Sequence, residues 1–237
     1  EPQVTERVVN TILAEMDALK EDAHTRELCR GLRRLMTKNF TRRLFDTKAE
    51  VFRDCRYDGK LSTSISEHGN AAPICFGLCN AAATKSIVEA IFARKTVPAV
   101  EAQPFFSAVV LNAFAKIGRF DLALRYIDDR WGKRMVDKGA ESAYEEWYRN
   151  GSWRNGDWHG FLRTESHAWS AYPACFLVQH LIGLEILEPG GARIRLKPQP
   201  TAFDYKVRYP LPAGIITVAN KAGRITVCPP EGVVVAD

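Results

Sequence analysis

The chain has 237 residues, of which 46% are hydrophobic and 26% are charged. This composition is ordinary for a folded globular protein and excludes wholesale disorder. No run of the sequence approaches the ~20 consecutive apolar residues that a membrane-spanning helix needs. We therefore expect one large domain or two modest ones, with no membrane partner.

The formal net charge of +5 comes from one stretch, residues 26–43, which we call the basic segment. It holds seven basic side chains and one acidic one, whereas 26 basic and 27 acidic residues lie outside it. Apolar residues at helical spacing predict a single amphipathic helix with a basic face: Leu28, Leu32, Leu35, Met36 and Leu44. A solvated face is the main interpretation. Binding of phosphate or nucleic acid is a subordinate hypothesis, because no base-reading motif accompanies the charge.

The six cysteines are scattered and fit neither a disulfide framework nor a zinc or redox motif. We therefore expect no metal site and no cofactor, and this cysteine usage favours a reducing compartment. No signal peptide is visible, but the chain begins at Glu1 without a methionine. The sequence therefore does not decide the localisation of the protein.

Up to about residue 187 the apolar residues follow a helical period. The pattern predicts helices over residues 4–19, the basic segment, and residues 67–82, 85–94, 105–117, 121–131 and 167–187. Gly118 is expected to close the helix before it as a C-cap, and Pro173 lies in the second turn of the last helix. Sequential helix pairs with short links are typical of stacked αα-hairpins.

After Pro189-Gly190-Gly191 the period changes to two, as expected of half-buried strands. Alternating or β-rich runs cover residues 193–197, 205–209, 215–219, 224–227 and 233–235. We predict a helical domain over residues 1–188 and a small antiparallel β domain over residues 189–237, with residues 188–191 as the hinge. The fold class is mainly α.

All five tryptophans fall within 39 positions: Trp131, Trp147, Trp153, Trp158 and Trp169. Three of them lie in or beside a Gly/Asn/Asp-rich stretch, residues 148–160, that we expect to be a long loop. Carboxylates and histidines are interleaved with them. Indole faces can stack on the C–H faces of a sugar, and carboxylates accept hydrogen bonds from its hydroxyls. From composition alone, anchoring of the loop by these aromatics is the main interpretation, and a carbohydrate site is the subordinate one.

Three further runs carry a resemblance to a known family. They are Gly139-Ala-Glu-Ser-Ala-Tyr-Glu-Glu-Trp147, Ser166-His-Ala-Trp-Ser-Ala-Tyr-Pro173 and Gly183-Leu-Glu-Ile-Leu-Glu-Pro-Gly190. In order and spacing they resemble the C-terminal region of bacterial α-L-rhamnosidases, glycoside hydrolase family 78, over roughly residues 50–235. Ser66-Glu-His-Gly-Asn-Ala71 resembles an upstream segment of the family.

The resemblance implies the late part of an (α/α)6 toroid of paired helices, followed by part of a small antiparallel β-sandwich. It implies an inverting hydrolase with Glu145 as the general base, although Tyr144 stands where the family has a tryptophan. His167 and Trp169 would contact the sugar, and Glu67 and His68 are weaker candidates. The alternative for His167 and Trp169 is a core histidine and a packed indole.

The general acid of the family lies in an Asp-Cys-Pro/Arg-Glu-Arg segment that nothing here matches. Asp54-Cys55-Arg56 lacks the proline and the following acidic pair. About seven helices are predicted, where a closed toroid needs twelve. We therefore expect part of an α-L-rhamnosidase-like hydrolase that lacks its acid, whose carbohydrate partner is a rhamnose-containing glycoside. Trp147, Trp153 and Trp158 would line the sugar site together with the residues named above.

The alternative is a non-catalytic carbohydrate-binding remnant of the same fold. Exposed apolar helix faces of a partial toroid predict self-association. The compartment, by the resemblance, would be the bacterial cytoplasm or periplasm.

Overall fold

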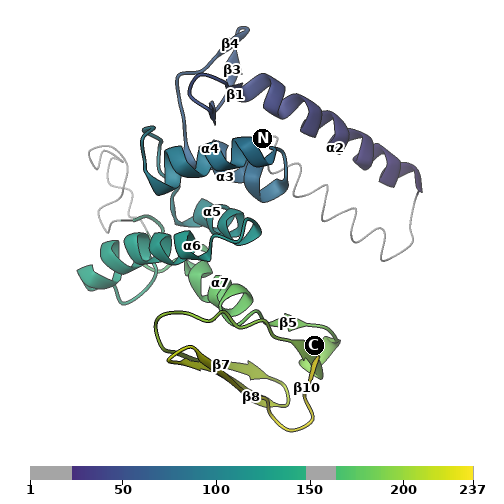
Figure 1. Ribbon diagram of the computed structural model, residues 1–237, viewed down its shortest axis with the longest axis vertical. Helices are drawn as coiled ribbons and strands as arrows, with labels where there is room; N and C mark the ends of the chain where they lie inside the picture. Colours follow the sequence, from purple (N-terminus) through teal and green to yellow (C-terminus); the bar gives the residue numbers. More distant parts are fainter. Residues whose placement is uncertain (1–22, 148–163, 237) are drawn as a thin grey trace. The chain divides into compact units, whose positions relative to one another are not determined.

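The computed structural model describes residues 23–147 and 164–236, and the predicted helix over residues 4–19 lies outside them. The described residues form two compact units: the first ends at Glu165 and the second begins at Ser166. Short antiparallel sheets accompany a mainly helical chain (Figure 1). In the described ranges, no helix has both the length and the apolar character needed to span a bilayer.

Helices dominate the first unit. Its α-helices are α2 (Ala23–Leu44), α3 (Glu67–Phe76), α4 (Ala81–Ile87), α5 (Pro104–Lys116) and α6 (Phe120–Ile127). Two π-helical segments, η1 (Val88–Ala93) and η2 (Asp128–Gly132), directly continue α4 and α6, and a 3-10 turn, η3, covers Val136–Lys138. Helix α3 packs against α5, and α5 packs against α6. Observed helical elements lie close to three of the predicted helices, those over residues 85–94, 105–117 and 121–131.

The predicted helix over residues 67–82 is wrong in one respect, because the structure divides it. Ser66 caps the start of α3 by accepting a hydrogen bond from the Gly69 amide at 3.0 Å. Gly77 then adopts a left-handed conformation, φ +73°, and ends the helix. Asn80 caps a new start, since its side chain accepts a hydrogen bond from the Ala83 amide at 2.9 Å.

Two short antiparallel hairpins join α2 to α3. They pair β1 (Phe45–Asp46) with β2 (Val51–Phe52), and β3 (Arg56–Tyr57) with β4 (Lys60–Leu61). Phe52 is fully buried and packs its ring 5.1 Å from that of Phe40 near the end of α2. The sequence pattern did not predict these hairpins, because two-residue strands are too short to show a period.

Helix α2 confirms the single helix predicted for the basic segment. Cys29 and Phe40 are its buried residues, whereas Leu28, Leu32 and Leu35 are 44–59% exposed. Three leucines of the apolar stripe are therefore exposed, whereas Met36 and Leu44 are partly buried. Self-association through exposed helix faces stays a prediction.

The second unit combines one helix with two sheets. A 3-10 turn, η5 (Ala168–Ala171), leads into α7 (Tyr172–His180), and a second turn, η6 (Pro189–Gly191), follows the first strand. One sheet has the order β10–β6–β5, formed by Val234–Ala236, Arg193–Arg195 and Glu185–Ile186. The other has the order β7–β8–β9, formed by Tyr205–Leu211, Gly214–Lys221 and Arg224–Cys228. All these strand pairs are antiparallel except β10 with β6, which is parallel.

The helix predicted over residues 167–187 is too long at both ends. Helix α7 ends at His180, and Gly183 follows with φ +63°. A Cβ atom at Gly183 would lie 2.6 Å from the carbonyl oxygen of Lys197, so the close approach of these backbones requires glycine. Residues 185 and 186 consequently leave the helix and pair with β6.

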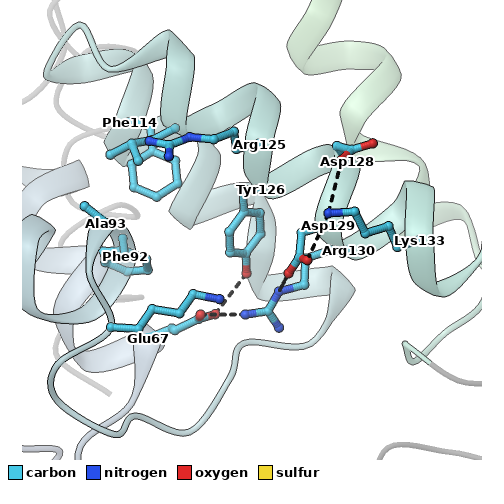
Figure 2. Close-up of a pocket in the computed structure, with 12 residues that line it drawn as sticks. Glu67, Phe92, Ala93, Phe114, Arg125, Tyr126, Asp128, Asp129, Arg130 and Lys133 are labelled. Atoms are coloured by element: carbon cyan, nitrogen blue, oxygen red, sulfur yellow. Dashed lines mark hydrogen bonds and ion pairs between the residues drawn. The ribbon is translucent and has the colours of Figure 1, made fainter.

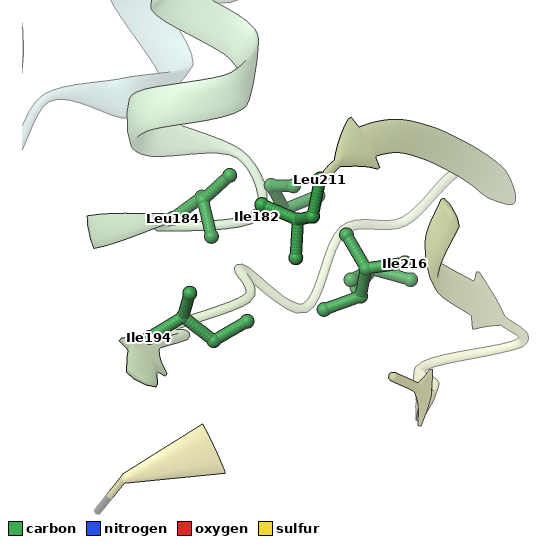
Figure 3. Close-up of a cluster of buried hydrophobic side chains, with 6 residues drawn as sticks. Ile182, Leu184, Ile194, Leu211 and Ile216 are labelled. Carbon is green, nitrogen blue, oxygen red and sulfur yellow. The ribbon is translucent and has the colours of Figure 1, made fainter. Parts of the chain in front are cut away.

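The core of the second unit lies among its strands (Figure 3). It consists of Ile182, Leu184, Ile194, Leu211, Ile216 and Val218, each no more than 8% exposed. Residues 188–191, predicted as the hinge between domains, lie between β5 and β6 inside this unit. Helix α7 belongs to the same unit as the strands, so the division after Glu165 differs from the one expected after residue 188.

Adjacent isoleucines on β8 provide a test of this core. Ile216 is fully buried and Ile215 is 47% exposed, as strand alternation requires. Ile216→Ala should lower the free energy of unfolding by about 2–5 kcal/mol, because it leaves a cavity. Ile215→Ala is the matched control and should cost less than half as much. Urea unfolding followed by circular dichroism measures both, and equal losses would contradict the assigned face of β8.

Candidate functional site

The start of α3 presents a buried carboxylate, that of Glu67. Glu67 is 4% exposed and accepts three hydrogen bonds, of which Figure 2 shows those from Tyr126 and Arg130. The Ala102 amide and the Tyr126 hydroxyl donate to Oε2, each at 2.9 Å, and Arg130 Nη2 donates to Oε1 at 2.7 Å. The hydroxyl of Tyr126 also lies 3.1 Å from Ser107 Oγ. Three converging donors match an ionised carboxylate, which only accepts hydrogen bonds.

Burial and charge act on Glu67 in opposite directions. Burial raises the pKa of Glu67 above its ordinary value, while the Arg130 guanidinium and the hydrogen bonds from Ala102 and Tyr126 pull it down. The pKa of Tyr126 is raised well above its ordinary value, by burial first and then by the adjacent Glu67 charge. Tyr126 therefore remains a hydrogen-bond donor at physiological pH.

Arg130 links this carboxylate to further charges and to aromatic rings. Its side chain is 1% exposed, and Nη1 lies 2.7 Å from Glu101 Oε2. Arg134 also binds Glu101, at 2.7 Å. Partial burial raises the pKa of Glu101, but the bond from Arg134 and the charge of Arg130 outweigh it and leave the pKa lowered. The guanidinium carbon lies 4.9 Å from the Tyr126 ring centre and 5.6 Å from that of Trp147, both within cation–π range.

Trp147, a predicted sugar-stacking residue, is 1% exposed. Its Nε1 donates to the Ala102 carbonyl at 2.8 Å, and its ring lies edge-on to Trp131 with centres 4.8 Å apart. The indole is therefore enclosed by other residues of the first unit. Trp153 and Trp158 lie outside the described residues.

Glu145, the predicted general base, is partly buried in a segment of bends. Its backbone amide donates to the Thr164 carbonyl at 3.0 Å, and its Oε2 accepts a hydrogen bond from the Thr164 amide at 3.2 Å. Nearby, the Ser142 hydroxyl donates to the Glu165 carbonyl. Among the described residues, none donates to Oε1 of Glu145. The neighbouring Glu146, by contrast, is buried at 6% exposure.

A cavity of about 240 Å³ adjoins the buried carboxylate (Figure 2). Glu67, Tyr126 and Arg130 line it together with apolar side chains such as Phe92 and Phe114. Glu145 is not among the residues that line this cavity. His68, predicted as a weaker sugar contact, is partly buried, and its ring lies 4.5 Å from that of Phe106.

His167 and Trp169 lie in the second unit and stack on each other. Their rings are 3.7 Å apart and nearly parallel, at 15°. Trp169 is 43% exposed, whereas His167 is partly buried. The Nδ1 atom of His167 is buried and has no hydrogen-bond partner among the described residues. Such an exposed aromatic pair can stack on the C–H face of a sugar.

Several residues of the buried network escaped the sequence analysis: Glu101, Tyr126 and Arg130. Arg130 directly precedes Trp131 at the end of the helix predicted over residues 121–131, so a charged residue beside a large aromatic was the available signal. Within the described ranges, no group of three or more His, Cys, Asp or Glu side chains could hold a metal ion. All six cysteines lie in those ranges as free thiols.

By sequence, the chain matches no protein-family profile and no curated protein. Its structure is similar to several solved enzymes. A GH78 family rhamnosidase of Bacillus sp. GL1 aligns with 25% identity and a TM-score of 0.68, over 82% of this chain and 20% of that one. An α-L-rhamnosidase from Dictyoglumus thermophilum aligns with 15% identity and a TM-score of 0.66, over 90% and 23%. A rhamnosidase from Klebsiella oxytoca with rhamnose bound aligns with 17% identity and a TM-score of 0.62, over 75% and 33%.

The chain therefore resembles part of the GH78 α-L-rhamnosidases and has a glycoside hydrolase-like fold. It spans between a fifth and a third of the length of these three structures.

The buried ion pair can be tested by truncating its cation. Arg130→Ala leaves the Glu67 charge buried without a counter-charge, and should lower the free energy of unfolding by about 3–5 kcal/mol. Arg125→Ala removes a 65% exposed side chain that pairs with Asp121 across 3.3 Å. This matched control should cost no more than ~1 kcal/mol. Urea unfolding at neutral pH measures both, and equal costs would contradict the network.

The loss of unfolding free energy in Arg130→Ala, called the deficit below, should also depend on pH. Without the guanidinium, the pKa of Glu67 rises further above its ordinary value of 4.5. Below 4.5 Glu67 is protonated in both the folded and unfolded states, so the missing counter-charge matters least there. The deficit should grow as the pH rises through the folded-state pKa. A deficit that does not change with pH would show that the loss is one of packing alone.

Proposed function

We propose that this chain is part of an inverting α-L-rhamnosidase-like glycoside hydrolase, with Glu145 as its general base. The observation that carries the proposal is the structural similarity to a GH78 rhamnosidase over four-fifths of the chain. In this proposal the paired helices of the first unit form part of an (α/α)6 toroid. The strands of the second unit form part of the β-sandwich that follows it.

The geometry of Glu145 suits the role of a base. Glu145 is only partly buried, and the Thr164 amide holds Oε2, while no described residue donates to Oε1. In an inverting hydrolysis the base takes a proton from water as the water oxygen attacks the anomeric carbon. A carboxylic acid roughly 6.5–9.5 Å away protonates the departing glycosidic oxygen. The base therefore needs an ionised, water-accessible carboxylate in a fixed position.

Sugar contact is proposed for the aromatic pair His167 and Trp169, because Trp169 is 43% exposed and its ring stacks on that of His167. His68 is a further candidate. Trp147 and Glu67 are enclosed by their neighbours, and we assign them no direct contact with the sugar. L-rhamnose is the natural probe, since two of the similar solved structures contain it.

The proposal leaves the general acid outside the described chain. Asp54 does not replace it. The Asp54 carboxylate accepts a hydrogen bond from the Ser66 hydroxyl at 2.6 Å, and the sequence that follows Asp54 lacks the acidic pair of the family segment. The chain by itself should therefore cleave an aryl α-L-rhamnoside no faster than a buffer control. Release of the aryl group is measured by absorbance. Robust turnover that is lost in Glu145→Gln would overturn the missing acid while supporting the base.

A non-catalytic carbohydrate-binding remnant is the second candidate, and the exposed stack of His167 and Trp169 favours it. Titration with L-rhamnose should change tryptophan fluorescence in a saturable way, and Trp169→Phe should remove most of that change. Trp131→Phe, at an 8% exposed site, is the control and should preserve it. The absence of saturation at millimolar sugar would count against binding. The coding sequence upstream of Glu1 separates the candidates, because an in-frame, carboxylate-rich stretch there favours the hydrolase.

A further inference from the structure

We infer that Glu67 is a positioning residue, which holds Trp147 in the core and thereby fixes Glu145, two residues earlier in the chain. The inference rests on the proposed role of Glu145. Glu67 itself touches no reacting atom in this scheme. Its carboxylate reaches Trp147 by two routes, one through backbone hydrogen bonds and one through the guanidinium of Arg130.

The backbone route passes through Ala102. The Ala102 amide donates to Glu67 Oε2 at 2.9 Å, and the Ala102 carbonyl accepts from Trp147 Nε1 at 2.8 Å. The next residue, Gln103, accepts a hydrogen bond from the Trp147 amide through its side chain at 3.4 Å. Glu67 therefore fixes the orientation of the same short stretch, just before α5, to which Trp147 is attached.

The second route passes through Arg130. Its guanidinium bonds to Glu67 at 2.7 Å and lies over the Trp147 ring. Its other charged partner at 2.7 Å, Glu101, has a side chain that is 42% exposed. Without the Glu67 charge, attraction to Glu101 would draw the guanidinium toward the surface and away from the indole. Glu67 thus balances the position of Arg130 as well as its charge.

The segment around Glu145 depends on such anchors because it has no regular secondary structure. At one side Glu145 pairs with Thr164, and at the other Trp147 is inserted into the core. A shift of Trp147 is carried to Glu145 through two residues of backbone. Trp147 thereby links the buried carboxylate of Glu67 to the partly buried carboxylate of Glu145.

The charge of Glu67, and not only its shape, is required. In Glu67→Gln one oxygen becomes an NH₂ group, which donates hydrogen bonds. If the NH₂ group takes the place of Oε1 it faces the Arg130 donor, and if it takes the place of Oε2 it faces the Ala102 amide and the Tyr126 hydroxyl. Either orientation breaks one route to Trp147. Glu67→Asp keeps the charge but shortens its reach, and so should weaken both routes only partly.

The test uses the full chain with ¹⁵N-labelled indoles and ¹³C-labelled carboxyls, studied by NMR. Trp147→Phe and Glu145→Gln assign the two reporter signals. In Glu67→Gln the Trp147 indole N–H should exchange with solvent at least ~10-fold faster, and both reporter signals should shift. Glu67→Asp should give intermediate values. Ile87→Val, a buried change in α4, controls for destabilisation and should leave both signals in place.

Unchanged Trp147 and Glu145 signals in Glu67→Gln would overturn the inference, as would equal effects of Ile87→Val. If Glu67→Gln does not fold, Glu67→Asp decides by the same criteria. Addition of L-rhamnose to the unsubstituted chain tests the proposed function separately. Reporter shifts in Glu67→Gln without any response of the unsubstituted chain to rhamnose would uphold the positioning role and count against the sugar site.

Discussion

The ion pair between Glu67 and Arg130 is the constraint on which the first unit depends. Both side chains are almost completely buried, and a charge in that environment is costly unless a counter-charge and hydrogen bonds surround it. The pair therefore fixes the start of α3 relative to η2, and through the Ala102 amide it fixes the entry to α5. A buried ion pair adds little net stability compared with apolar packing, but it admits few alternative arrangements.

The carboxylates of Glu67, Glu101 and Glu145 lie in three different environments. Glu67 accepts three hydrogen bonds, Glu101 pairs with two arginines near the surface, and Glu145 is partly buried and accepts one hydrogen bond from the described residues. Position in the fold, not residue type, therefore separates a structural carboxylate from a candidate catalytic one. The aromatic residues divide in the same way, since Trp147 is 1% exposed while Trp169 is 43% exposed.

Much of the candidate site could be named from sequence, but the burial of its members could not. Glu145, His167 and Trp169 were predicted from ordered motifs, and Glu67 from a weaker one, and their roles stay predictions. Arg130 was not identified from the sequence, because a single arginine within an apolar pattern is usually exposed to solvent. Its burial depends on η2, where the widened π-helical turn lets Arg130 and Trp131, adjacent in sequence, both face inward. No period in the sequence reports that turn.

The sequence alone determined the helix-rich body, the change to strand alternation after residue 191, and the resemblance to part of the GH78 α-L-rhamnosidases. These follow from local periodicity and motif order, which need no knowledge of distant contacts. Tertiary structure decided the rest. Residue 183 has to be glycine because the Lys197 backbone passes too close for a side chain, and the predicted helix ends before it. Helix α7 and the strands belong to the same compact unit. Likewise Glu67 is a buried anchor only because residues 35 to 63 positions away supply its donors.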